Sequence, residues 1–94
     1  MAGNADWLVK SNVEAGEGFA DIVVEPEDPD KGAIFELKHS RTAAGLDKSC
    51  EKAIAQIKDR RYADYLKNDG RYNITLYGVS FYKKRCKVIA ERLM

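Results

Sequence analysis

Residues 33–40, Ala-Ile-Phe-Glu-Leu-Lys-His-Ser, are the stretch from which the fold of this chain is best predicted. The apolar and aromatic residues predict a strand, and side chains alternate between the two faces of a strand. Glu36 and Lys38 therefore share one face, while Phe35 and Leu37 lie on the other. A carboxylate and an amine in such a strand indicate either a buried strand entering a functional site or an ion pair on an edge strand.

The composition is that of one small folded domain of 94 residues, with 45% hydrophobic and 33% charged residues. The net charge is only +1, so the whole molecule gives no strong electrostatic indication of nucleic-acid binding. No apolar run reaches membrane-spanning length and the N-terminus lacks a signal peptide, so we expect a cytoplasmic protein without a membrane partner. The two cysteines have no partner at metal-binding spacing and are expected to be buried thiols. Residues 1–94 are expected to form a single domain, and whether they are a fragment of a larger protein stays open.

Hydrophobic patterns along the chain predict an α/β fold built on one mixed sheet. The alternation predicts strands at 7–14, 19–25, 33–40, 72–82 and 86–93. From Leu46 the apolar spacing becomes helical and continues to a stop at Asp69-Gly70, which predicts one long helix. The order is therefore β-β-β-α-β-β, with an antiparallel N-terminal meander. One helix covers only one face of a sheet, so we expect a second copy or a missing N-terminal helix to cover the other face.

Asp21 is the residue that gives Glu36 and Lys38 a chemical interpretation. It lies in a strand that otherwise contains apolar residues, and the hairpin that follows places this strand beside residues 33–40. Two carboxylates suit Mg²⁺, which prefers oxygen ligands and retains several waters. Lys38 would orient or deprotonate a water polarised by that metal, which is sufficient for phosphodiester hydrolysis. The alternative is an internal ion pair between Asp21 and Lys38.

The spacing of these residues resembles the PD-(D/E)xK nuclease superfamily. Asp21 is followed by fourteen residues and then by Glu36-Leu37-Lys38, and a helix comes next. The segments at 14–24, 55–62 and 77–81 look like the nuclease-like C-terminal domain of AAA-ATPase-like bacterial proteins. The resemblance implies a restriction-endonuclease-like core, which here lacks the first helix of that fold.

The resemblance also implies roles for individual residues. Asp21 and Glu36 would be metal ligands for Mg²⁺ or Mn²⁺, with the Leu37 carbonyl as a third, and Lys38 would be the catalytic lysine. Gln56 would be the helical residue near the active site. Two other residues share its helix face and either contact phosphates or form a solvated surface: Lys52 and Arg60.

Two hypotheses about function follow from this resemblance. The first is a Mg²⁺-dependent nuclease that hydrolyses phosphodiester bonds in DNA and works as a homodimer. The second is a catalytically inactive nuclease-like module that serves nucleic-acid binding or protein assembly within a larger ATPase-linked polypeptide.

Overall fold

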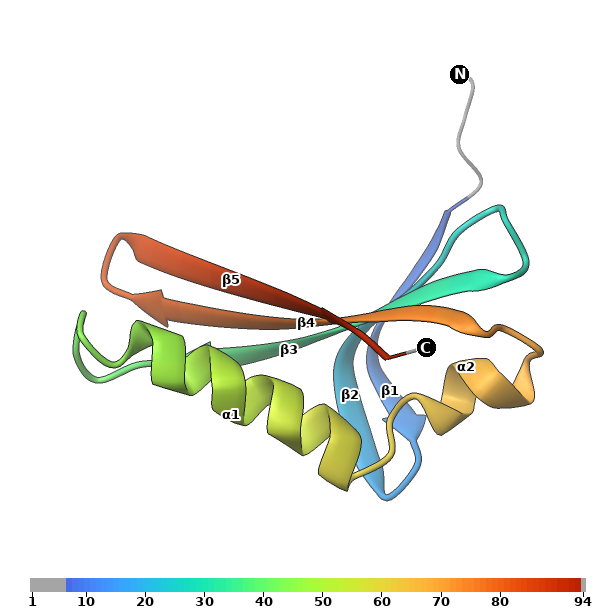
Figure 1. Ribbon diagram of the computed structural model, residues 1–94, viewed down its shortest axis with the longest axis horizontal. Coiled ribbons are helices and arrows are strands. Elements are labelled where there is room, and N and C mark those ends of the chain that lie inside the picture. Colours follow the sequence, from blue (N-terminus) through green and yellow to red (C-terminus); the bar gives the residue numbers. More distant parts are fainter. Residues whose placement is uncertain (1–6, 94) are drawn as a thin grey trace.

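The fold is a five-stranded sheet with helices inserted between its third and fourth strands (Figure 1). The computed structural model describes residues 7–93. The elements are β1 (Leu8–Ala15), β2 (Gly18–Glu25), β3 (Lys31–His39), α1 (Leu46–Asp59), α2 (Asp64–Asn68), β4 (Asn73–Tyr82) and β5 (Arg85–Arg92).

The strand order in the sheet is β1-β2-β3-β4-β5. β3 and β4 are parallel because the chain crosses through α1 between them, and every other neighbouring pair is antiparallel. The predicted mixed sheet with its β-β-β-α-β-β order is confirmed, and it is consistent with a restriction-endonuclease-like fold. No helix precedes β1 in the part of the chain that the structure describes.

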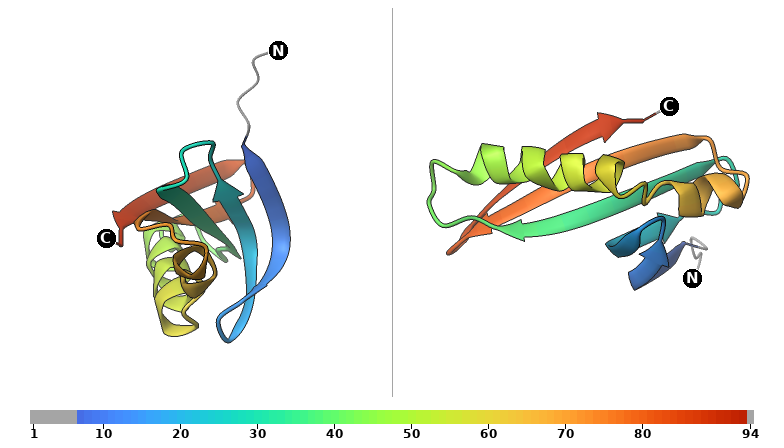
Figure 2. Two further views of the ribbon diagram at one scale, coloured as in Figure 1. Left: turned by 90° about the vertical axis from the view of Figure 1, so that its right-hand side faces the viewer. Right: turned by 90° about the horizontal axis from the view of Figure 1, so that it is seen from below.

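The hydrophobic core lies between the sheet and the helices, which both cover the same face (Figure 2). Ile34 on β3 and Leu76 on β4 point into it, as their even positions on the two parallel strands predict. Ile57 from α1 and Leu66 from α2 fill it from the other side. All four side chains are fully buried.

The predicted continuous helix from Leu46 to the stop at Asp69-Gly70 is wrong, because the helix breaks after Asp59. Arg61 adopts a left-handed backbone with φ +53°. Its N–H donates to Lys58 O, and the N–H of Tyr62 donates to Ile57 O, which is the Schellman arrangement that ends helices. The usual residue at the left-handed position is glycine, so an arginine there gave no sequence signal for the end of the helix. α2 is followed by the same arrangement, with Gly70 in the left-handed position, where the stop was predicted.

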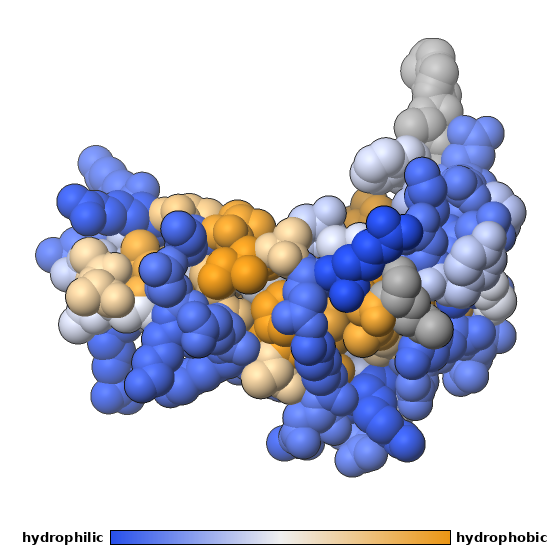
Figure 3. Space-filling view, in the orientation of Figure 1, coloured by the Kyte–Doolittle hydropathy of each residue, from blue (hydrophilic) through white to orange (hydrophobic). Residues whose placement is uncertain are grey.

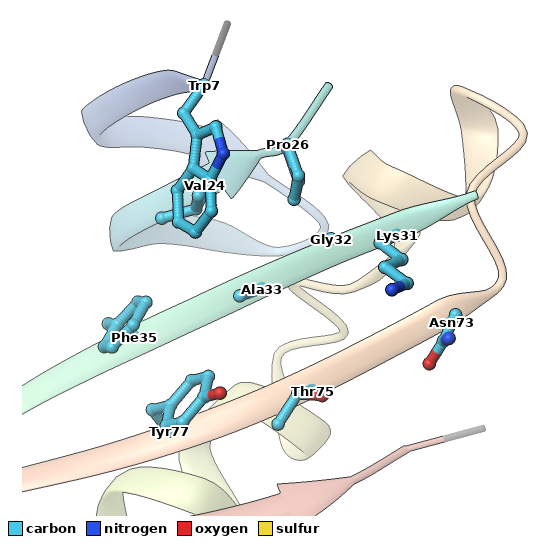
Figure 4. Close-up of a pocket in the computed structure, with 10 residues that line it drawn as sticks. All are labelled: Trp7, Val24, Pro26, Lys31, Gly32, Ala33, Phe35, Asn73, Thr75 and Tyr77. Carbon is cyan, nitrogen blue, oxygen red and sulfur yellow. The ribbon is translucent and has the colours of Figure 1, made fainter. Parts of the chain in front are cut away.

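The face of the sheet opposite the helices is open and partly apolar. Phe35 and Tyr77, neighbours on β3 and β4, stack with ring centroids 4.4 Å apart. Beside them is a shallow hollow of about 330 Å³, over which Trp7 and Pro26 lean (Figure 4). Large apolar side chains of this face remain exposed in the described chain. They include Leu37, Phe81 and Val88.

The cysteines differ from the prediction at one position. Cys50 on α1 is buried, but Cys86 is exposed because it lies on the edge strand β5. Neither helix within residues 7–93 is long and apolar enough to cross a membrane.

Candidate active site

Asp21 lies where β2 separates from β3. The pairing of these strands covers only Ile22–Val24 on β2. On the other side, the β1–β2 pairing skips Asn12 and Asp21, and Asn12 has a left-handed backbone with φ +53°. Ala20 and Val23 both face the core although they are three residues apart, so the strand reverses its faces in this interval. The Asp21 carboxylate there accepts the N–H of Leu37 at 2.8 Å, in place of a strand partner.

Glu36 is a buried carboxyl group on the helix-covered face of β3, only 3% exposed. Its Oε2 accepts a hydrogen bond from Gln56 Nε2 at 2.6 Å, but its Oε1 is buried without a hydrogen-bond partner among residues 7–93. Burial, reinforced by the negative charge of Asp21, raises the pKa of Glu36 to about 7 from its ordinary value of 4.5. The fold therefore holds two carboxyl groups close together in a site that disfavours their joint ionisation.

Gln56 joins Glu36 to Lys38. Its amide oxygen accepts a hydrogen bond from the Lys38 ammonium, and its amide N–H donates to Glu36. This orientation of the amide is the one that the two charges require, because a carboxylate needs a donor and an ammonium needs an acceptor. Lys38 Nζ also lies 4.0 Å from Glu36 Oε2. One side chain from α1 thus fixes both members of the Glu-x-Lys pair on β3.

Gly78 allows α1 to lie close enough to the sheet for these contacts. It is paired with Glu36 across the parallel β3–β4 ladder. A Cβ atom at this position would lie 2.4 Å from the backbone oxygen of Cys50 on α1. Any side chain here would push the helix, and Gln56 with it, away from β3.

The predicted alternative of an ion pair between Asp21 and Lys38 does not form in the described chain. Lys38 pairs with Glu36, while Asp21 binds the backbone of Leu37. No group of three or more His, Cys, Asp or Glu side chains within residues 7–93 is arranged to hold a metal ion. The candidate ligands on these two strands are the carboxylates of Asp21 and Glu36, whose charges interact. Such a set suits a hard divalent cation that retains part of its water shell.

The two further residues expected at the helix surface have different surroundings. Lys52 lines a hollow of about 750 Å³ together with Lys38 and Gln56. Arg60 does not line this hollow. It follows the last residue of α1, is exposed, and lies 3.9 Å from Asp59.

Tyr62 is a residue of the site that the sequence analysis missed. Its hydroxyl lies 3.2 Å from Gln56 Nε2, and the ring is buried. It reaches Gln56 only because the helix breaks at Arg61 and turns the chain back. A regular helix would place residues six positions apart on different faces, so the spacing gave no signal.

Comparison with known protein families gives a match for this chain. The family model of the PD-(D/E)XK nuclease superfamily matches residues 2–91, nearly the entire chain. A search of curated proteins and a search of solved structures gave no match. The matched range contains the carboxylates on β2 and β3, the lysine that follows them, and the glutamine on α1. This chain therefore belongs to the PD-(D/E)XK nuclease superfamily.

Proposed function

We propose that this nuclease-like domain is a Mg²⁺-dependent phosphodiesterase that cleaves DNA. The observation that carries the proposal is the unpartnered Oε1 of Glu36 beside Asp21. An unpaired buried oxygen costs about 1–3 kcal/mol, and burying it next to a second carboxylate adds electrostatic repulsion. Binding of a divalent cation by Asp21 and Glu36, with the Leu37 carbonyl as a third ligand, would relieve both penalties.

A bound Mg²⁺ or Mn²⁺ supplies charge neutralisation at the phosphate and lowers the pKa of coordinated water. Lys38 then orients the water that attacks phosphorus, because its ammonium is held beside Glu36 by the Gln56 amide. Water forms the new P–O bond and gives up a proton to solvent, while the bond to the leaving sugar oxygen breaks and that oxygen takes up a proton from solvent. Gln56 is a positioning residue, since it acts through Glu36 and Lys38.

The test is cleavage of supercoiled plasmid and of labelled single-stranded DNA with Mg²⁺ or Mn²⁺. Wild type is expected to cleave both substrates. The cleavage rates of Glu36→Ala and Lys38→Ala are expected to be at least 100-fold lower, which is a common effect of removing a catalytic group. The matched control is Glu25→Gln, because Glu25 is also a buried carboxylate but is paired with Lys10 and Arg71. If wild type cuts no faster than Glu36→Ala, the chain is not a hydrolase.

A second candidate function is assembly without catalysis, and the open face of the sheet favours it. Leu37 and Phe81 on this face are 38% and 39% exposed, and Val88 is 51% exposed. We propose that a second copy of the chain covers this face, because a two-fold contact brings the same apolar patch onto itself. Sedimentation of wild type and of Phe35→Lys tests this. A wild type that stays monomeric excludes the homodimer and leaves a larger ATPase-linked polypeptide as the remaining expectation.

A further inference from the structure

The cationic side chains without an ion pair are concentrated at one end of the molecule. The loop between β3 and α1 and the turn between β4 and β5 both lie at this end, on the left of Figure 1 and again in the right-hand view of Figure 2. The two segments are in contact, since Ser40 N donates to Phe81 O at 2.7 Å and Ala43 lines a hollow with residues 82–85. The same end is covered largely by hydrophilic side chains in Figure 3.

We call this surface the basic end and define it by exposed residues that form no ion pair within residues 7–93. They are Arg41, Lys48, Lys52, Lys83, Lys84 and Arg85. The cations elsewhere on the described chain are mostly paired, as Lys58 is with Glu91 and Arg61 with Glu17. An overall charge of +1 therefore conceals a local positive field.

The basic end is continuous with the candidate active site. The hollow that contains Lys38 and Gln56 extends to Arg41 and Lys48, and no carboxylate from residues 7–93 lines it. Gln56 and Lys48 are eight residues apart on α1, which is about 12 Å at a rise of about 1.5 Å per residue. The phosphates of one strand advance about 3.4 Å per nucleotide along the axis of a duplex, so this length spans three or four nucleotides of a duplex whose axis runs parallel to α1.

We infer that the basic end binds the phosphate backbone of double-stranded DNA on one side of the cleavage position. The inference rests on the proposed function, and it adds the β4–β5 turn as part of the substrate-binding surface. A duplex fits better than a single strand because no Phe, Tyr or Trp of the described part of the chain lines the hollow. Surfaces that bind unpaired bases combine cations with aromatic stacking. The nearby Tyr82 ring is engaged by Lys83, whose Nζ lies 5.4 Å from its centroid.

The experiment measures duplex affinity by fluorescence anisotropy in EDTA over 50–200 mM salt, so that it does not depend on cleavage. The test protein carries Lys83→Ala, Lys84→Ala and Arg85→Ala together. If each contacts one phosphate, the slope of log affinity against log salt becomes shallower by about 2.7, because each contact contributes about 0.9. A second variant, Lys48→Ala with Lys52→Ala, is expected to reduce the slope by about 1.8 on the same basis.

Two controls make the result specific. Lys67→Ala removes an exposed cation without an ion pair in the described chain, but on α2 at the opposite end, and is expected to leave the slope unchanged. A second control keeps the charges of the β4–β5 turn by Lys83→Arg, Lys84→Arg and Arg85→Lys, and this variant is expected to keep the wild-type slope. The inference is overturned if the triple alanine variant binds the duplex with the affinity and salt slope of wild type. It is also overturned if Lys67→Ala reduces the slope as much as the triple variant does, or if wild type shows no salt-dependent duplex binding. Equal or tighter binding of single-stranded DNA overturns the duplex assignment. If wild type binds the duplex in this way but does not cleave plasmid DNA with Mg²⁺ or Mn²⁺, the proposed hydrolase is wrong and the inferred binding surface stands.

Discussion

Replacing Glu36 with glutamine should make the metal-free protein more stable at pH 8. Glutamine keeps the shape of the side chain and can still accept the hydrogen bond from Gln56. It removes, however, a buried negative charge placed beside Asp21. Without a metal, that charge is offset only in part, by the Gln56 amide N–H at 2.6 Å and by Lys38 Nζ at 4.0 Å from Glu36 Oε2.

The size of the effect follows from the pKa of Glu36, which is about 7 in the folded protein against an ordinary 4.5. Between these two values the folded state binds more protons than the unfolded state, so wild-type stability falls as pH rises from about 4.5 to about 7. At about 1.36 kcal/mol per pKa unit, the loss is about 3 kcal/mol. For a domain of this size, about 4–8 °C of melting temperature corresponds to each kcal/mol, so the variant should melt more than about 10 °C higher at pH 8.

The assay is thermal and urea denaturation of both proteins at pH 5 and pH 8 in EDTA. Other ionisable groups are common to both proteins and cancel in the difference. Glu25→Gln is the matched control, since it removes another buried carboxylate, one that forms ion pairs with Lys10 and Arg71, and should destabilise by about 1–3 kcal/mol. Saturating Mg²⁺ should stabilise wild type, by about 2.7 kcal/mol at a hundredfold excess over Kd, and leave Glu36→Gln unchanged.

One result would refute the reasoning. If the stability difference between wild type and Glu36→Gln is the same at pH 5 and pH 8, Glu36 does not carry a raised pKa. The two carboxyl groups would then not be held against their mutual repulsion, and the principal support for a cation between them would be lost.

Three further predictions concern the metal, the helix and the buried hydroxyl. Because Glu36 must lose its proton to bind a cation, Mg²⁺ affinity measured by calorimetry should rise up to about tenfold per pH unit below pH 7 and level off above it; Asp21→Asn should abolish binding, and a flat profile contradicts the ligand assignment. Gly78→Ala should destabilise by about 1–3 kcal/mol in urea and weaken Mg²⁺ binding, since its Cβ would displace α1; unchanged stability would show that the helix can yield. Ser80 Oγ is buried without a partner among residues 7–93, so Ser80→Ala should be neutral or stabilising by up to about 1 kcal/mol; clear destabilisation in the same urea assay would show that the hydroxyl is satisfied, for example by buried water.

Most of the sheet could be predicted from the sequence because it follows alternation. Ile34 and Glu36 share the helix-covered face, and Phe35 and Leu37 the open face, as a period of two requires. The neighbourhood of Asp21 and Glu36 was also accessible, since a short hairpin brings their strands together. These features depend on local sequence and on short connections.

The features that could not be predicted depend on backbone conformations adopted by unexpected residues. Arg61 takes the left-handed position that normally signals a helix end through glycine, and Asn12 does the same within a strand. The chain turns at Arg61 and thereby brings Tyr62 to Gln56, and the irregularity at Asn12 lies beside Asp21. A hydrophobic period of two or 3.6 does not predict either change of direction. The partner of Lys38 was also not predicted: the Asp21 carboxylate accepts the N–H of Leu37, and Lys38 instead contacts Glu36 and Gln56.

The irregularity at Asn12 also bears on how the protein avoids aggregation. β1 is an edge strand, and an edge with a regular row of unpaired N–H and C=O groups can recruit strands from other molecules. The left-handed residue interrupts that row halfway along the strand. The feature that accompanies the turn of Asp21 toward Leu37 thus also makes the edge a poor template for intermolecular pairing. A substitution that straightened β1, such as Asn12→Val, would therefore be expected both to weaken the metal site and to promote fibril formation.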